Sequence, residues 1–172
     1  MQAELEILEG RPEAAHARLI PLLDRPGLQE GDVTALLPVL AWAQLELGQA
    51  DEAAETVAEA LRRGRPEEMR LVLVEALRVQ ALVALRQEQW HEAALSLDEG
   101  LALARSMSYP YAHARLLRLS ADLHRARGER DRAREQFSAA LALFHRLGAR
   151  KDAAQVERDL AALGPYPPAL TG

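Results

Sequence analysis

Small and apolar residues recur along this chain at intervals of forty residues. Six columns share the interval: Leu37, Leu77 and Leu117; Ala41, Ala81 and Ala121; Ala53, Ala93 and Ala133; Val57, Leu97 and Phe137; Ala60, Gly100 and Ala140; and Leu61, Leu101 and Leu141. Most neighbouring columns lie three or four residues apart, which places them on one face of a helix. An internal repeat of this length is typical of stacked helix pairs, because one pair alone cannot bury its apolar face.

Glycine and proline divide the chain into helical segments. We expect helices over 1–10 (the end of one), 12–24, 32–47, 51–63, 66–86, 90–105, 110–127, 131–147 and 151–163. Asp32 is the predicted N-cap of its helix, and Pro66 is predicted to open the helix over 66–86 with Glu67 and Glu68 in its first turn. Pro21 predicts a kink or an early end, and Pro38 predicts a kink or a later start.

These segments predict a single all-α domain over residues 1–164. It comprises a partial repeat at 1–25, repeats at about 32–65, 66–106 and 110–148, and a capping helix at 151–163. The sequence has no alternating strand pattern with hairpin turns. The proline-rich residues 165–172 are expected to form an extended linker or tail.

Composition narrows the function classes. The chain is 49% hydrophobic but only 4% aromatic, so alanine and leucine fill the interior and let helices approach closely. It has no cysteine, which excludes disulfides, cysteine nucleophiles and thiolate metal sites. The net charge of −5 argues against nucleic-acid contact by this segment. Charges interrupt every apolar run before it could span a membrane, so we expect a cytoplasmic protein.

The repeat units resemble a known family. The pattern Leu37-x3-Ala41-x6-Gly48-x4-Ala53-x3-Val57-x2-Ala60 resembles the tetratricopeptide repeat core, and the two later units follow it. The family's usual period is about 34 residues, and longer first helices would explain the difference. The resemblance implies a right-handed α-solenoid of antiparallel helix pairs.

The forty-residue period is similar to the sensor arrays of the large ATP-binding LuxR-type (MalT-like) bacterial activators. Residues 139–149, followed by Ala153 and residues 160–164, are similar to the ends of such arrays. This resemblance implies a non-catalytic binding module, the ligand-sensing or protein-interaction domain of a multidomain transcriptional regulator. The alternative is a stand-alone scaffold or adaptor that mediates protein–protein interactions. The chain contains no phosphate-binding loop and no DNA-binding unit, so we expect it to be a fragment of a longer regulator.

The resemblance also implies a binding face, because the first helix of each tetratricopeptide pair lines the concave groove. By register, the positions on that face include Leu45, Glu75 and Leu85. The candidate ligand or partner residues are Trp42, Glu46, Arg78, Leu82, Arg115, Arg118, Asp122 and Arg125. An arginine cluster with one aromatic anchor suits an acidic or carboxylate-bearing partner, whether a protein, a peptide or a small-molecule effector. The alternative is a solvated charged face.

We find no catalytic or metal-binding motif in the sequence to go with this predicted binding face. The five histidines lack the helical spacing of metal ligands, and acid pairs at predicted helix starts are explained by capping and the helix dipole. We therefore expect no catalytic residue, no metal site and no cofactor. Self-association through the ends of the array is a further expectation, because end repeats expose apolar surface.

Overall fold

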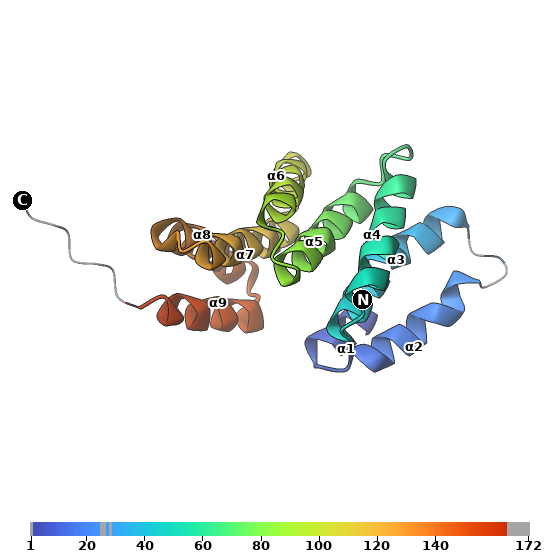
Figure 1. Ribbon diagram of the computed structural model, residues 1–172, viewed down its shortest axis with the longest axis horizontal. Coiled ribbons are helices and arrows are strands. Elements are labelled where there is room, and N and C mark those ends of the chain that lie inside the picture. Colours follow the sequence, from blue (N-terminus) through green and yellow to red (C-terminus); the bar gives the residue numbers. More distant parts are fainter. Residues whose placement is uncertain (1, 25–26, 28, 165–172) are drawn as a thin grey trace, which may run out of the picture. The chain divides into compact units, whose positions relative to one another are not determined.

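The structure, a computed structural model, describes residues 2–24, 27 and 29–164, and every regular element in these ranges is an α-helix. In chain order they are α1 (Gln2–Leu8), α2 (Pro12–Leu23), α3 (Glu30–Glu46), α4 (Ala50–Gly64), α5 (Arg70–Arg86), α6 (Trp90–Ser106), α7 (Pro110–Ala126), α8 (Arg130–Leu147) and α9 (Arg150–Ala162) (Figure 1). The chain divides into two compact units, Met1–Met107 and Ser108–Gly172, which are described separately as unit 1 and unit 2. The all-α prediction is confirmed for the described ranges.

From α3 onward, the helices begin twenty residues apart, at residues 30, 50, 70, 90, 110, 130 and 150. The residue two positions before each start from α4 onward has a positive φ: Gly48, Glu68, Glu88, Ser108, Gly128 and Gly148. At the end of α3, the N–H of Gln49 reaches the carbonyl of Gln44 at 2.9 Å, a helix-ending bond that a left-handed residue allows. Alternate helices thus begin forty residues apart, at the interval of the sequence columns.

Two of the predicted helix starts are wrong. Asp32 is not the N-cap, because α3 begins at Glu30 and the side chain of Asp32 instead accepts the backbone N–H of Gln29 at 3.3 Å. Pro66 does not open a helix, since α5 begins only at Arg70. Glu67 and Glu68 therefore lie in the turn before α5, and the N–H of Met69 closes that turn on the carbonyl of Gly64 at 3.0 Å.

The two internal prolines end neither helix: α2 continues through Pro21 to Leu23, and α3 contains Pro38 near its middle. A proline removes one backbone hydrogen bond, yet α3 buries Leu37, Leu40 and other apolar residues on both sides of it. This burial offsets the missing bond, so neither an early end nor a late start results.

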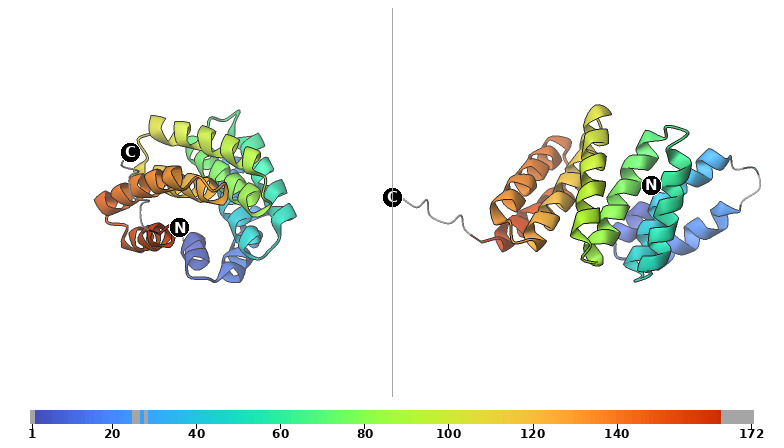
Figure 2. Two further views of the ribbon diagram at one scale, coloured as in Figure 1. Left: turned by 60° about the vertical axis from the view of Figure 1, so that its left-hand side comes forward. Right: turned by 45° about the horizontal axis from the view of Figure 1, so that its top comes forward.

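Unit 1 is a two-layer stack of α1 to α6 (Figure 2). Each helix packs against the next, and α3 packs in addition against both α1 and α5. Helices α5 and α6 are antiparallel, because Arg70 at the start of α5 bonds Ser106 at the end of α6, and Ser96 donates to Gln80 at 3.0 Å between their middles. One layer therefore contains α1, α3 and α5, and the other contains α2, α4 and α6.

The sequence columns form the core. Every residue of the six columns is buried except Leu141, which is half-buried. In unit 1, Ala41, Ala53, Ala81 and Ala93 have no exposed surface. At the other end of the unit, Arg18 of α2 contacts the carboxylate of Glu6 on α1 at 2.6 Å and lowers its pKa.

Unit 2 is built from α7, α8 and α9. Helix α8 packs against both neighbours, and its Phe137 and Phe144 are fully buried. Helix α9 corresponds to the predicted capping helix, with Ala153, Val156 and Leu163 buried. Ala154 and Leu160 of the same helix are half-buried. The predicted tail at 165–172 lies outside the described residues.

Among the described residues, no helix combines the length and the apolar character needed to cross a membrane.

Replacing Glu68 by glycine should raise the free energy of unfolding by about 1 kcal/mol. Glu68 adopts a φ of 49°, where a side chain is unfavourable and glycine is not. The control is Glu67→Gly in the same turn, which adds freedom to the unfolded chain without relieving a positive φ and should lower stability. Urea unfolding followed by circular dichroism measures both changes, and equal shifts would contradict this account of the turn.

Candidate functional site

The predicted binding residues of unit 1 converge on an arginine stacked on a tryptophan. The guanidinium carbon of Arg78 on α5 lies 4.5 Å from the ring centroid of Trp42 on α3. The Nε of Arg78 donates to Glu75 at 2.9 Å. Both stacked residues are buried, with 5% of Arg78 and 7% of Trp42 exposed. Arg78 and Trp42 therefore join two helices of one layer, and their expected role in binding a partner stays a prediction.

The local sequence explains this burial. Residues 41 and 81 are both alanine, so α3 and α5 approach closely and leave little room for solvent between them. A buried guanidinium needs a compensating charge and a favourable contact for its flat face. Glu75, one turn before Arg78, supplies the charge, and the indole of Trp42 supplies the face.

A second bridge joins the ends of the same two helices. Arg86 Nη1 donates to the carbonyl of Leu45 at 2.7 Å, and Arg86 Nη2 donates to Glu46 at 2.7 Å. Trp42 Nε1 donates to the same carboxylate at 3.3 Å. A cation at this position is favoured by the C-terminal end of α3, where carbonyl groups lack helical partners. Sequence reasoning missed Arg86, although its distance of forty residues from Glu46 was a usable signal.

The other predicted binding residues of unit 1 also make contacts within the unit. Leu45 is buried, and Leu82 is half-buried against the core. Glu46 is the most exposed of the group but already accepts two hydrogen bonds.

In unit 2, the predicted residues of α7 form an ion-pair network with α9. Arg118 Nε donates to Asp159 at 3.1 Å, and Arg125 Nη2 donates to Asp122 at 2.6 Å. Arg115 lies with its guanidinium carbon 5.6 Å from the ring of Tyr111. Sequence reasoning missed Asp159, although it follows Arg118 by 41 residues, nearly the repeat interval. These contacts bring Arg118, Asp122 and Arg125 close together on α7.

Burial raises the pKa of Asp122. Its neighbours Arg125 and Arg118 oppose the change, and the carboxylate of Asp159 adds to it. The raised pKa shows that desolvation outweighs the two arginines at this position. Asp159 is additionally held by Gln155, whose Nε2 donates to it at 3.0 Å.

These two groups belong to different units, so each is a candidate surface by itself. Trp42 and Arg78 lie in unit 1, and Arg118 lies in unit 2. Within the described ranges, no three histidine, aspartate or glutamate side chains are placed to hold a metal ion. The expectation of no catalysis stays a prediction.

Replacing Arg78 by glutamate should destabilise unit 1 by about 3–5 kcal/mol, because it leaves buried carboxylates without a counter-charge. The control is Arg105→Glu on α6, where the side chain is exposed. This control should shift the melting temperature little. Thermal unfolding by circular dichroism measures both, and a small effect at Arg78 would contradict its structural role.

Replacing Asp122 by asparagine should stabilise the protein at neutral pH. The pKa of Asp122 is raised from 3.8, so the folded state disfavours its charged form. This penalty is present above the folded pKa and disappears as the pH falls towards 3.8 and below. Unfolding measured from pH 7 down to pH 3 should therefore show the gain at the upper end only. A gain independent of pH would contradict the electrostatic cause.

Comparison with known proteins bears on the fold. No protein-family model matches this sequence, and no curated protein matches it. A solved structure, BtubC (BKLC) from P. vanneervenii, is similar with a TM-score of 0.65 and 17% sequence identity. The similarity covers 96% of this chain and 80% of that one. At this identity the likeness concerns the helical fold alone.

Proposed function

We propose that this chain is a non-catalytic binding module with the architecture of a right-handed, tetratricopeptide-like α-solenoid of forty-residue repeats. The observation that carries the proposal is that alternate helices contact each other at the same sequence separation in both units. Arg86 reaches Leu45 across 41 residues in unit 1, and Tyr111 reaches Asp152 across 41 residues in unit 2. Helix pairs stacked in a constant register produce long continuous faces, which such proteins use for binding.

The face of α7 in unit 2 supports an acidic partner. Arg115 and Arg118 are half-buried, and the side chain of Arg125 is 44% exposed. Two of these arginines already hold carboxylates, those of Asp159 and Asp122. A carboxylate of a partner would replace these internal ones at the same guanidinium groups. Unit 2 contains 11 basic and 7 acidic residues, which favours approach of an anion.

The wider role that we propose is the sensor or interaction domain of a LuxR-type, MalT-like bacterial regulator in the cytoplasm. Its support is the forty-residue pattern and the similarity of residues 139–164 to the ends of such arrays. Binding would shift the array between packing states and pass that shift to ATPase and DNA-binding domains. The coding sequence on both sides should then encode a phosphate-binding loop upstream and a helix-turn-helix downstream. A coding sequence with neither would contradict the regulator and favour the adaptor.

Replacing Arg118 and Arg125 together by glutamine should weaken binding of an acidic probe by roughly tenfold or more. Each charged hydrogen bond to the probe contributes to the free energy of binding, and the double replacement removes the charge from both donors. The probe is a fluorescein-labelled oligoglutamate peptide, followed by fluorescence anisotropy with the full chain.

The matched control replaces Arg130 and Arg146 by glutamine, which removes the same charge from exposed positions of α8 in the same unit. Melting curves verify that both variants fold. If both double variants weakened binding of the peptide equally, the peptide would be attracted by the overall positive charge of unit 2 and not by Arg118 and Arg125. That result, or no binding to the original protein, would overturn the acidic-partner proposal.

A further inference from the structure

The layer of unit 1 that contains α4 and α6 has a hollow on its outside. The hollow measures about 300 Å³ and is lined by residues of α4, α5, α6 and the turn between α5 and α6. Val57, Val83 and Ala84 form its apolar base and are themselves buried. Leu95 of α6 also lines it, although 57% of this leucine is exposed.

The hollow follows from the unequal packing of the two layers. Helices α3 and α5 are in close contact, joined by the Arg78–Trp42 stack and by Arg86. Helices α4 and α6 pack less closely, and an ion pair between Arg65 and Glu99 spans them on the surface. Helix α5 is therefore accessible between them along part of its length.

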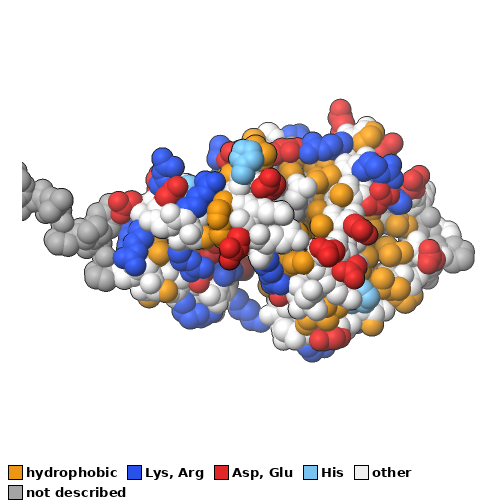
Figure 3. Space-filling view, viewed as in Figure 1, with side chains coloured by type: hydrophobic (Ala, Val, Ile, Leu, Met, Phe, Trp, Pro, Cys, Tyr) orange, Lys and Arg blue, Asp and Glu red, His pale blue; other side chains and the backbone are white. Residues whose placement is uncertain are grey.

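Exposed carboxylates lie on the elements that line this hollow, and one of them, Glu92, lines it directly. Asp51, Glu52 and Glu55 lie on α4, and Glu88 and Glu92 lie at the turn before α6 and in its first turn. All five are exposed, and none of their carboxylates has a hydrogen bond or an ion pair within the part of the chain that the structure describes. Acidic and hydrophobic side chains lie together over α4 in the space-filling view (Figure 3).

The arginines near this face are already paired. Arg62 and Arg63 contact Glu59, and Arg65 contacts Glu99. Unit 1 as a whole contains 19 acidic and 10 basic residues. The negative charge around the hollow is therefore not compensated from within the unit.

We propose that this hollow, the α4–α6 groove, docks a basic amphipathic helix of a partner protein. The apolar base accepts leucine-sized side chains from one stripe of the helix. Glu92 in the lining and the other exposed acids of α4 and the turn before α6 then attract lysine or arginine beside that stripe, which is the charge pattern of a basic amphipathic helix. Nucleic acids and anionic membranes are repelled by the same acids.

A fixed amide adds a directional contact. Ser96 is 6% exposed and donates its hydroxyl to Gln80 Oε1 at 3.0 Å. This bond orients the Gln80 amide with its Nε2 hydrogens left for the occupant. Because the groove belongs to unit 1 and the proposed acidic-partner surface lies on α7 of unit 2, the inference goes beyond that surface and fails or holds separately from it.

The test uses the full chain and a labelled helical probe made of two heptads with the order leucine–lysine–lysine–leucine–leucine–lysine–leucine. Anisotropy should show binding that weakens with added salt, and the same peptide with glutamate in place of lysine should not bind. Leu95→Gln should weaken binding roughly tenfold through lost apolar contact. Glu88→Gln combined with Glu92→Gln should weaken it by roughly as much.

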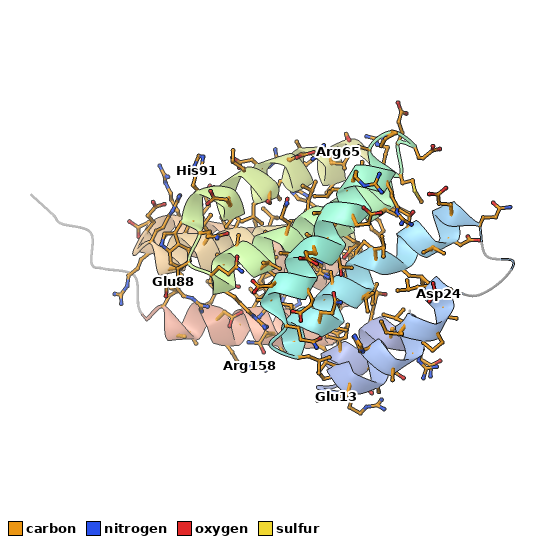
Figure 4. The ribbon with its side chains drawn as sticks, turned by 45° about the vertical axis from the view of Figure 1, so that its right-hand side comes forward. Glu13, Asp24, Arg65, Glu88, His91 and Arg158 are labelled. Atoms are coloured by element: carbon orange, nitrogen blue, oxygen red, sulfur yellow. The ribbon has the colours of Figure 1, made fainter. Side chains whose placement is uncertain are left out.

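Two matched controls separate this groove from general attraction. Leu71→Gln removes an equally exposed leucine, 56% against 57%, from α5 on the other layer. Glu13→Gln combined with Asp24→Asn removes the same charge at α2, away from Glu88 (Figure 4). Both controls should leave the dissociation constant within about twofold. Absence of binding by the original protein, or equal weakening by either control, would overturn the proposal.

Discussion

The close approach of alternate helices is the constraint on which the rest of unit 1 depends. Alanine at the contact columns lets α3 and α5 lie together, and a larger side chain at either position would push them apart. That approach forces Arg78 against Trp42 and brings Arg86 to the carbonyl of Leu45. On the other layer, α4 and α6 pack less closely than α3 and α5 do.

Much of the fold could be predicted from the sequence, because the helix-forming pattern is local and repeated. The apolar columns identified the core, and most helix ends were found to within two residues. The turn at Glu68 was missed for a physical reason: glutamate occupies a left-handed position where glycine is the usual signal. A proline two residues before it then suggested a helix start that the turn geometry does not allow.

The candidate site was harder to predict, because burial of a charged side chain depends on partners that are distant in sequence. Arg78 and Arg118 occupy one column, yet Arg78 is buried against Trp42 whereas Arg118 is one-third exposed beside Asp159. The column alone cannot distinguish these outcomes, since they depend on Trp42 beside Arg78 and on Asp159 beside Arg118, which lie far away in sequence. The division of charge between an acidic unit 1 and a basic unit 2, in contrast, is visible in the residue counts.

The regular spacing of helix starts limits how a chain of this kind can change in length. Each residue added within a helix rotates everything after it by about 100° about the helix axis, so a single insertion would turn the alanine columns towards solvent. A duplicated or deleted stretch of forty residues leaves every contact register unchanged, because alternate helices begin forty residues apart. Relatives of this chain should therefore differ in length by whole helix pairs, and their surfaces should lengthen or shorten without being rebuilt.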